Sequence, residues 1–252
     1  MIDKIFNEDC LIGMQRIPDK SIDCIICDLP YGTTACKWDN VIPFEPLWVE
    51  YKRIIKDGGA IVLFGSQPFT SALVMSNPSW FKYEWIWQKN AGSNFGAVKY
   101  QPMKEHENIL VFGKGRTRYF PQRQKRADSG YARQKTPIKY NTKTECYADS
   151  LHHNMEVMIP KDRVPSSVQK FNRERGLHTT QKPVELIRYL IRTYTLEGEL
   201  VLDNCIGSGT TAIAAMRESR HFIGFELEKK YYDIACKRIE EERQNLKLNF
   251  DD

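Results

Sequence analysis

The stretch that decides the fold is residues 200–211, which read Leu200-Val201-Leu202-Asp203-Asn204-Cys205-Ile206-Gly207-Ser208-Gly209-Thr210-Thr211. An apolar run that ends in an acid predicts a buried strand, and the two glycines let the backbone approach a ligand closely. The threonines begin a helix whose free N–H groups can bind a carboxylate. A second strand over residues 221–226 ends in Glu226, and an acid about 20 residues after such a loop can accept both hydroxyl protons of a ribose. These elements predict a ligand-binding α/β unit.

The spacing of the glycines narrows the choice of ligand. It matches neither the G-x-G-x-x-G pattern of dinucleotide folds nor the phosphate loop with its lysine. A nicotinamide cofactor and a nucleoside triphosphate are therefore poor fits. A glycine turn between a strand and a helix can also be a tight connection only, so the loop alone does not establish a cofactor.

A second informative stretch, Asp28-Leu29-Pro30-Tyr31, follows the apolar run over residues 22–27. A buried strand thus ends in a carboxylate, a stiff turn and an aromatic ring. This arrangement suits a planar aromatic base, because acceptors at the end of the strand can hold the N–H bonds of its exocyclic amine. Asp28 supplies one acceptor, the carbonyl of Leu29 can supply a second, and Tyr31 offers a stacking face. The alternative interpretation is an ordinary strand-to-turn sequence.

Taken together, the two stretches resemble the catalytic and cofactor motifs of DNA amino-methyltransferases, which use S-adenosylmethionine. The catalytic motif comes first, as in the β group of that family. Thr180-Gln181-Lys182-Pro183, residues 203–211 and residues 222–226 look like the family's tenth, first and second motifs. Two departures stand out: Leu29 replaces the first proline of Asp-Pro-Pro-Tyr, and Asn204-Cys205 replaces Pro-Phe, so that Cys205 takes the place of an aromatic beside the cofactor.

The resemblance implies the roles of individual residues. Asp28, Leu29, Pro30 and Tyr31 would hold the target base, and an aspartate at the first position favours adenine N6 over cytosine N4. Asp203 is placed for the ammonium of the cofactor's methionine moiety. On spacing alone Asp9 is a turn residue; the resemblance assigns it to the cofactor's adenine. The expected cofactor-binding set is Asp9, Cys10, Asp28, Lys182, Asp203, Cys205, Gly207, Ser208, Gly209, Thr210, Thr211 and Glu226.

The implied fold is α/β: a seven-stranded, mostly parallel, doubly wound sheet, permuted so that the chain starts at the fold's third strand. Apolar runs predict strands at residues 5–7, 24–27, 60–64, 84–87 and 109–112, the last two as a hairpin. A helix is expected over residues 46–55, ended by Asp57-Gly58-Gly59, and another from Pro183. Residues 1–115 would form the catalytic half, 116–178 a small inserted target-recognition module and 179–252 the cofactor-binding half.

The positive charge of the chain is concentrated in the middle segment. Residues 116–178 contain 14 Lys and Arg against 6 Asp and Glu, a local balance of +8, whereas the rest of the chain has a balance of −3. Such a stretch can be a solvated insertion, but beside a base-gripping motif it predicts a phosphate-facing surface on double-stranded DNA. Trp38, in the loop 33–40 expected to close over the flipped base, joins the predicted DNA-binding set Arg116, Arg118, Arg123, Lys125, Arg126, Arg133 and Lys135.

Composition excludes several other classes. The 252 residues are 41% hydrophobic with a mean hydropathy of −0.52, and no run approaches the ~20 apolar residues of a membrane helix. Seven cysteines in no repeated framework, without a signal-peptide pattern, indicate a reduced, cytoplasmic protein. The sequence is compatible with both a monomer and a homodimer. Neither Cys24 and Cys27 nor His152-His153 has partners at metal-ligand spacing, so no metal is expected.

The working hypothesis is a site-specific DNA adenine-N6 methyltransferase that uses S-adenosylmethionine. Cytosine-N4 methylation is the nearest alternative, followed by methylation of RNA or protein. A non-catalytic DNA-binding specificity partner on the same scaffold is the alternative from another class. The chain contains no Pro-Cys dipeptide, which excludes the nucleophile of cytosine-C5 methyltransferases.

Overall fold

The computed structural model describes residues 1–33, 39–125, 162–174 and 181–248. The chain divides into two compact units, Met1–Phe120 with Ser166–Asp252, and Pro121–Pro165. The first unit contains the large sheet and its helices. No helix in the described ranges is both long enough and apolar enough to cross a membrane.

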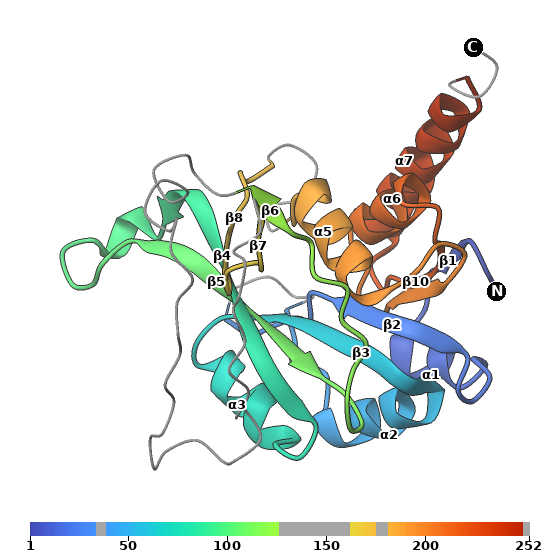
Figure 1. Cartoon of the computed structure of the whole chain (residues 1–252), viewed down its shortest axis with the longest axis horizontal. Coiled ribbons are helices and arrows are strands. Elements are labelled where there is room, and N and C mark those ends of the chain that lie inside the picture. Colours follow the sequence, from blue (N-terminus) through green and yellow to red (C-terminus); the bar gives the residue numbers. More distant parts are fainter. Residues whose placement is uncertain (34–38, 126–161, 175–180, 249–252) are drawn as a thin grey trace, which may run out of the picture. The chain divides into compact units, whose positions relative to one another are not determined.

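Eight strands of the first unit form one sheet (Figure 1). Its order is β1-β10-β9-β2-β3-β5-β4-β8, and only β5 runs antiparallel to its neighbours. The strands are β1 (Lys4–Phe6), β2 (Ile22–Cys27), β3 (Ile55–Gly65), β4 (Phe81–Ser93), β5 (Lys104–Phe112), β8 (Val168–Lys170), β9 (Leu200–Asp203) and β10 (His221–Phe225). The predicted fold class, with its β4–β5 hairpin, is confirmed. β8 adds an eighth strand because a segment expected in the inserted module pairs with β4 instead, Val168 opposite Ile86.

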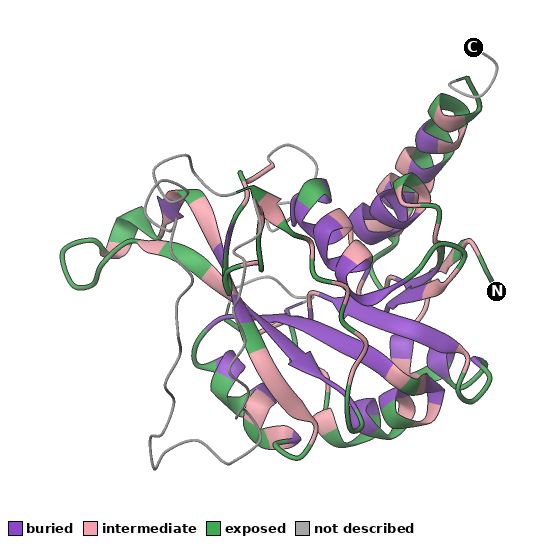
Figure 2. Ribbon diagram, viewed as in Figure 1, coloured by how far each residue is buried: buried purple, intermediate pink, exposed green. Residues whose placement is uncertain are grey.

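Helices cover both faces of this sheet (Figures 1 and 2). One layer contains α1 (Cys10–Met14), α2 (Phe44–Ile54) and α3 (Phe69–Ser76); the other contains α5 (Val184–Tyr194), α6 (Thr210–Arg217) and α7 (Lys229–Leu248). Successive strand residues point to opposite faces, so Ile25 and Ile61 pack with the first layer, while Ile26 and Val62 pack with the second. Burial on both faces explains why these strands read as continuous apolar runs.

Element ends differ from the sequence prediction at one place that affects the core. Asp57-Gly58-Gly59 was expected to end the second helix, but α2 ends at Ile54 and these residues belong to β3, which starts at Ile55. Gly58 has a left-handed backbone (φ 78°), and its carbonyl accepts a hydrogen bond from Arg118 N at 2.9 Å. Pro183 is the N-cap of α5, at the predicted start of that helix.

Arg118 has a structural role at the edge of the sheet where the parallel strands begin. Its guanidinium forms an ion pair with Glu199, just before β9, and lies 3.2 Å from Asp23 at the start of β2. Asp23 is buried and also contacts Lys56 Nζ at 2.8 Å. The structure therefore places Arg118 within the main unit, and its charge is already used by two carboxylates, unlike the free DNA-facing charge expected from sequence. Exposed Arg116 precedes it on the same segment.

The second unit covers fewer residues than the predicted module 116–178, because residues 116–120 and 166–174 belong to the first unit. Its described part is a short antiparallel pair, β6 (Gln124–Lys125) with β7 (Asp162–Arg163). Arg123 forms an ion pair with Asp162 at 2.9 Å. Arg126, Arg133 and Lys135 lie outside the described residues, so their part in DNA binding stays a prediction.

Candidate active site

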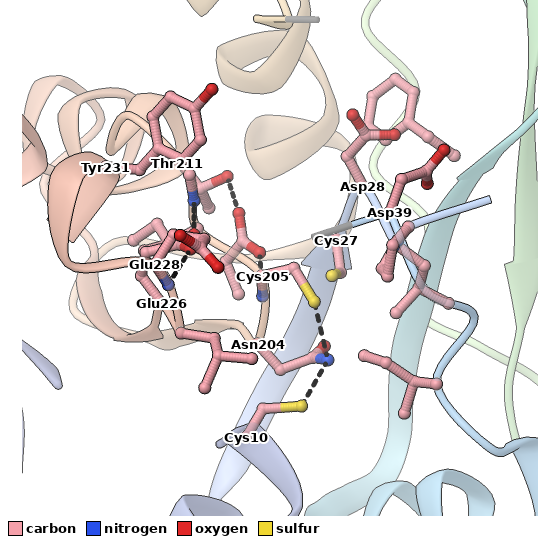
Figure 3. Close-up of a pocket in the computed structure, with 18 of the residues that line it drawn as sticks. Cys10, Cys27, Asp28, Asp39, Asn204, Cys205, Thr211, Glu226, Glu228 and Tyr231 are labelled. Carbon is pink, nitrogen blue, oxygen red and sulfur yellow. Dashed lines mark hydrogen bonds between the residues drawn. The ribbon is translucent and has the colours of Figure 1, made fainter. Parts of the chain in front are cut away.

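A cavity of about 410 Å³ lies at the carboxyl ends of β2, β9 and β10 (Figure 3). Parallel strands of such a sheet end at the same edge, so Asp28, Asp203 and Glu226, which end or follow these strands, reach one space. All four residues of the stretch 28–31 line it. So do the predicted cofactor residues Asp9, Cys10, Lys182, Cys205, Gly207, Ser208, Thr210 and Thr211. The two motifs, which lie in opposite halves of the sequence, therefore share one cavity.

On the cofactor side, Asp203 is held by neutral donors from the loop that follows it. Thr211 Oγ1 donates to Asp203 Oδ2 at 2.5 Å, and Cys205 N donates to Oδ1 at 3.1 Å. Burial raises the pKa of Asp203 to about 6, which these hydrogen bonds oppose. A cation that enters the cavity here would favour the ionised carboxylate.

Glu226 follows β10, the neighbour of β9 in the sheet, and its side chain bonds to the glycine loop. Gly207 N donates to Glu226 Oε2 at 2.9 Å, and Glu228 N donates to Oε1 at 2.8 Å. Burial raises the pKa of Glu226 as well. Its carboxylate thus lies at the cavity wall with its orientation fixed by backbone groups, and each oxygen retains lone-pair capacity for a hydroxyl donor.

Gly209 is the one predicted cofactor residue that does not line the cavity. It is the N-cap of α6 with φ 85°, a left-handed conformation that favours glycine. A Cβ atom there would lie 3.1 Å from the Cβ of Ala235 on α7. Gly209 therefore lets the loop turn into α6 while α7 packs close behind it; its expected role as a cofactor contact stays a prediction.

The floor of the cavity is neutral and rich in sulfur (Figure 3). Asn204 Nδ2 lies 3.5 Å from the Sγ atoms of both Cys10 and Cys205, and Tyr51 donates its hydroxyl to Asn204 Oδ1. Burial raises the pKa of Cys27 to about 12, so this thiol stays protonated at neutral pH. The two residues that depart from the family's Pro-Phe pattern therefore serve one hydrogen-bonded cluster.

Asp9 has the turn role that its spacing indicates. Its Oδ1 accepts Leu11 N at 2.7 Å and Ile12 N at 3.4 Å, which caps α1. The residue also lines the cavity, next to Cys10. The role that the resemblance assigned to it, a contact with the cofactor's adenine, remains a prediction.

On the catalytic side, ionisable side chains hold Asp28. Tyr31 donates its hydroxyl to Asp28 Oδ1 at 2.6 Å, and Lys182 Nζ donates to Oδ2. Burial raises the pKa of Asp28, and the neighbouring Lys182 ammonium opposes that rise. Lys182 was predicted to bind the cofactor; the structure places its ammonium against the carboxylate of Asp28.

A second carboxylate, which sequence reasoning missed, shares Lys182. Glu107 Oε2 lies 3.3 Å from Lys182 Nζ, and Glu107 Oε1 lies 2.5 Å from Lys89 Nζ. Burial alone would raise the pKa of Glu107, but the ammonium groups of Lys182 and Lys89 outweigh it and hold the pKa below its usual value. Lys182 Nζ also lies 5.1 Å from the ring centroid of Phe64. The only sequence signal was a run of charges just before the predicted strand 109–112.

The turn that carries Tyr31 is fixed by another residue, Asp39. Its two carboxylate oxygens accept Gly32 N and Thr33 N, each at 2.9 Å. The ring of Tyr31 stacks on Phe69 with centroids 5.0 Å apart. Trp38, predicted to contact the base from the same loop, lies outside the described residues.

A comparison with known proteins decides the family. The DNA methylase model (N6_N4_Mtase) matches residues 22–237, most of the chain. The chain belongs to the DNA methylase family. It is therefore a DNA methyltransferase of the adenine-N6 or cytosine-N4 class, which confirms the resemblance inferred from the two motifs.

Individual relatives of this methylase extend over nearly its whole length. It is 28% identical to the type II methyltransferase M.HinfI of Haemophilus influenzae, with 97% of this chain and 70% of that protein covered. It is 26% identical to M1.MboII of Moraxella bovis, with 93% of this chain and 95% of that protein covered. Among solved structures, the M1.HpyAVI–SAM complex gives a TM-score of 0.63 at 23% identity, with 93% and 98% covered. The cytosine-N4-specific PvuII DNA methyltransferase gives a TM-score of 0.65 at 14% identity, with 93% of this chain and 85% of that chain covered. These two structures support the fold.

Proposed function

We propose that this methylase transfers a methyl group from S-adenosylmethionine to N6 of an adenine flipped out of duplex DNA. The observation that carries the proposal is the shared cavity, where Asp28 and Tyr31 face the carboxylates of Asp203 and Glu226. One side suits an aromatic base with an exocyclic amine, and the other suits a ligand with an ammonium and ribose hydroxyls. Type II methyltransferases among the relatives favour a role in restriction-modification.

The residues around the glycine loop fit the cofactor. Asp203 would bind the ammonium of the methionine moiety, and Glu226 would accept the ribose hydroxyls. Bound S-adenosylmethionine supplies a methyl group activated by a sulfonium. Cys10 and Cys205 line the same wall, and their neutral thiols place no competing negative charge on it. That M1.HpyAVI was solved with SAM supports this assignment.

The target base would be held by Asp28, the carbonyl of Leu29 and the ring of Tyr31. Both oxygens of Asp28 already accept a hydrogen bond, one from Tyr31 and one from Lys182. Each oxygen keeps a second lone pair for an entering amine, but the Lys182 ammonium competes with the amine for Oδ2. Lys182 has a second acceptor available in Glu107, 3.3 Å away. We expect Lys182 to shift toward Glu107 when the base enters, which leaves Asp28 Oδ2 free to hold the amine N–H.

Adenine is favoured over cytosine because Asp28 stands at the first position of the catalytic motif, where the family resemblance associates aspartate with adenine N6. Cytosine-N4 methylation is the second candidate, since the PvuII enzyme of that specificity has the same fold. Both reactions use the same acceptors, so only the identity of the base separates them.

The test is to incubate the purified protein with methyl-labelled S-adenosylmethionine and unmethylated duplex DNA of mixed sequence, then identify the labelled nucleoside by mass. We expect N6-methyldeoxyadenosine. N4-methyldeoxycytidine would correct the base and keep the site. Absence of label in DNA, with the cofactor bound normally, would contradict the proposal and favour a non-catalytic specificity partner.

A further inference from the structure

The β4–β5 hairpin extends beyond the sheet next to the cavity. β3 ends at Gly65, which pairs with Asn108 on β5, but the pairing of β4 with β5 continues to Ser93 and Lys104. The projecting part, residues 87–107, is here called the hairpin arm (Figure 1). Glu107, at its base, lines the cavity. The arm therefore leaves the sheet at the edge where the base-binding residues lie.

The tip of the arm, residues 94–103, exposes apolar side chains (Figure 2). Tyr100 is 88% exposed and Phe95 is 64% exposed. Hydrogen bonds from Tyr100 N to Ala97 O (2.9 Å) and from Gln101 N to Ala97 O (3.1 Å) close the backbone of the tip. Val98 and Met103 are exposed beside them. A closed turn thus presents two aromatic rings to solvent, where another molecule can reach them.

The charge of the arm indicates which molecule this is. Residues 90–104 contain no Asp or Glu, although the whole chain has 32 acidic residues. Of the two lysines in this range, Lys99 is exposed, whereas half-buried Lys104 donates a hydrogen bond to Ser66 Oγ. Exposed Lys170, on β8, pairs with Gln88 at the base of the arm. Aromatic side chains among lysines, with no carboxylate between them, match single bases and phosphates, because every base has a face on which a ring can stack.

We infer that the tip of the hairpin arm contacts the duplex beside the target base, with Phe95 and Tyr100 packed against base faces that flipping exposes. Four residues separate Glu107 at the cavity from Met103 at the tip, about 13 Å along an extended strand. A duplex with one base in the cavity would lie close to the base of the arm. A two-stranded ribbon also fits the major groove, which is about 12 Å wide. This inference rests on the proposed DNA substrate.

The test compares Phe95→Ala/Tyr100→Ala with wild type by fluorescence anisotropy on an unmethylated mixed-sequence duplex, with S-adenosylmethionine present. We expect DNA affinity to fall about 10–100-fold, because stacking on a base is worth about 1–3 kcal/mol. The slope of log Kd against log salt should stay unchanged, since the lost contacts carry no charge. Lys99→Gln should instead reduce that slope by about one.

Controls separate the competing explanations. Met75→Ala removes an apolar side chain that is 71% exposed on α3, and it should leave DNA affinity unchanged. Calorimetry with S-adenosylmethionine checks that the arm variant keeps its cofactor site. Unchanged DNA affinity would overturn the inference. So would a dimer-to-monomer change in sedimentation velocity caused by the arm variant, because the tip would then join two copies. Wild type that binds no DNA would contradict the proposed function itself.

Discussion

The two sides of the cavity hold their carboxylates by different means. Asp203 and Glu226 are fixed by backbone N–H groups and a hydroxyl, all neutral and all close in the chain or on the neighbouring strand. Asp28 is fixed by Tyr31 and by Lys182, a cation that lies 154 residues away and is shared with Glu107. Neutral donors fix the orientation of a carboxylate, whereas a shared cation also lowers the pKa of the carboxyl group. The cofactor side is therefore a rigid receptor, and the catalytic side is an adjustable one.

The largest effect is expected from Asp28→Asn. The amide keeps the size of the side chain but loses an acceptor oxygen, so methyl transfer should fall by about 10²–10⁴-fold. Cofactor affinity, measured by calorimetry, should change little because the rigid receptor is intact. Asp57→Asn, at an exposed side chain, is the matched control. Loss of cofactor binding in Asp28→Asn would mean that the two sides do not divide their work as described.

Asp203→Asn tests the rigid receptor. Cofactor affinity should fall about 10–100-fold, since a hydrogen bond to a charged group contributes roughly 1.5–3 kcal/mol. Because the pKa of Asp203 is about 6 when folded, above its unfolded value, its ionised form lowers the stability of the cofactor-free protein above pH 6. The variant should therefore be more stable than wild type at pH 8 by roughly 1–3 kcal/mol, and the gain should vanish toward pH 4.

Thermal unfolding without cofactor measures that gain. Asp233→Asn, an exposed acid on α7, is the matched control and should alter neither cofactor affinity nor melting temperature. A melting temperature of Asp203→Asn below that of wild type at pH 8 would contradict the prediction.

A pair of substitutions tests the adjustable side. Lys182 lowers the pKa of Asp28 and Glu107 raises it. If transfer needs ionised Asp28, the acid limb of kcat/KM against pH should move up by about one unit in Lys182→Met. It should move down in Glu107→Gln, whose overall rate also falls because Lys182 then stays on Asp28. Glu105→Gln, exposed on the same strand, should leave the profile unchanged. Shifts of the same sign in both variants would disprove the sharing of Lys182.

The smallest effects are expected from substitutions that distinguish a structural arginine from basic residues that face DNA. Arg118→Met removes the guanidinium shared by buried Asp23 and half-buried Glu199, so it should cost roughly 1–3 kcal/mol of stability. The salt dependence of DNA binding should not change. Lys125→Gln and Arg133→Gln should each reduce the salt slope by about one and leave the melting temperature nearly unchanged. A changed salt slope of DNA binding in Arg118→Met would show that Arg118 contacts DNA.

Local patterns made the fold and half of the site predictable. The order of apolar runs and glycines locates β2, β9 and β10, and the acids at their ends follow from the shared edge of a parallel sheet. Contacts between distant segments carry no such signal. Nothing near Lys182 in the chain shows that it meets Asp28, and nothing near Glu107 shows that it meets Lys182. Arg118 belongs to a basic segment by composition, yet its partners start two strands of the sheet.

The position of β2 in the sheet has a consequence for the synthesis of the protein. One neighbour, β3, follows it closely in the chain, but the other is β9, and Leu200 at its start is 177 residues from Asp23. At roughly 5–20 residues per second, a ribosome needs about 10–35 s to make that stretch. Throughout this time one long edge of β2 has no partner, and an apolar edge of this kind attracts other strands. Asp28, which follows β2, shares a cavity with residues of β9 and the glycine loop only when the last fifth of the chain has emerged.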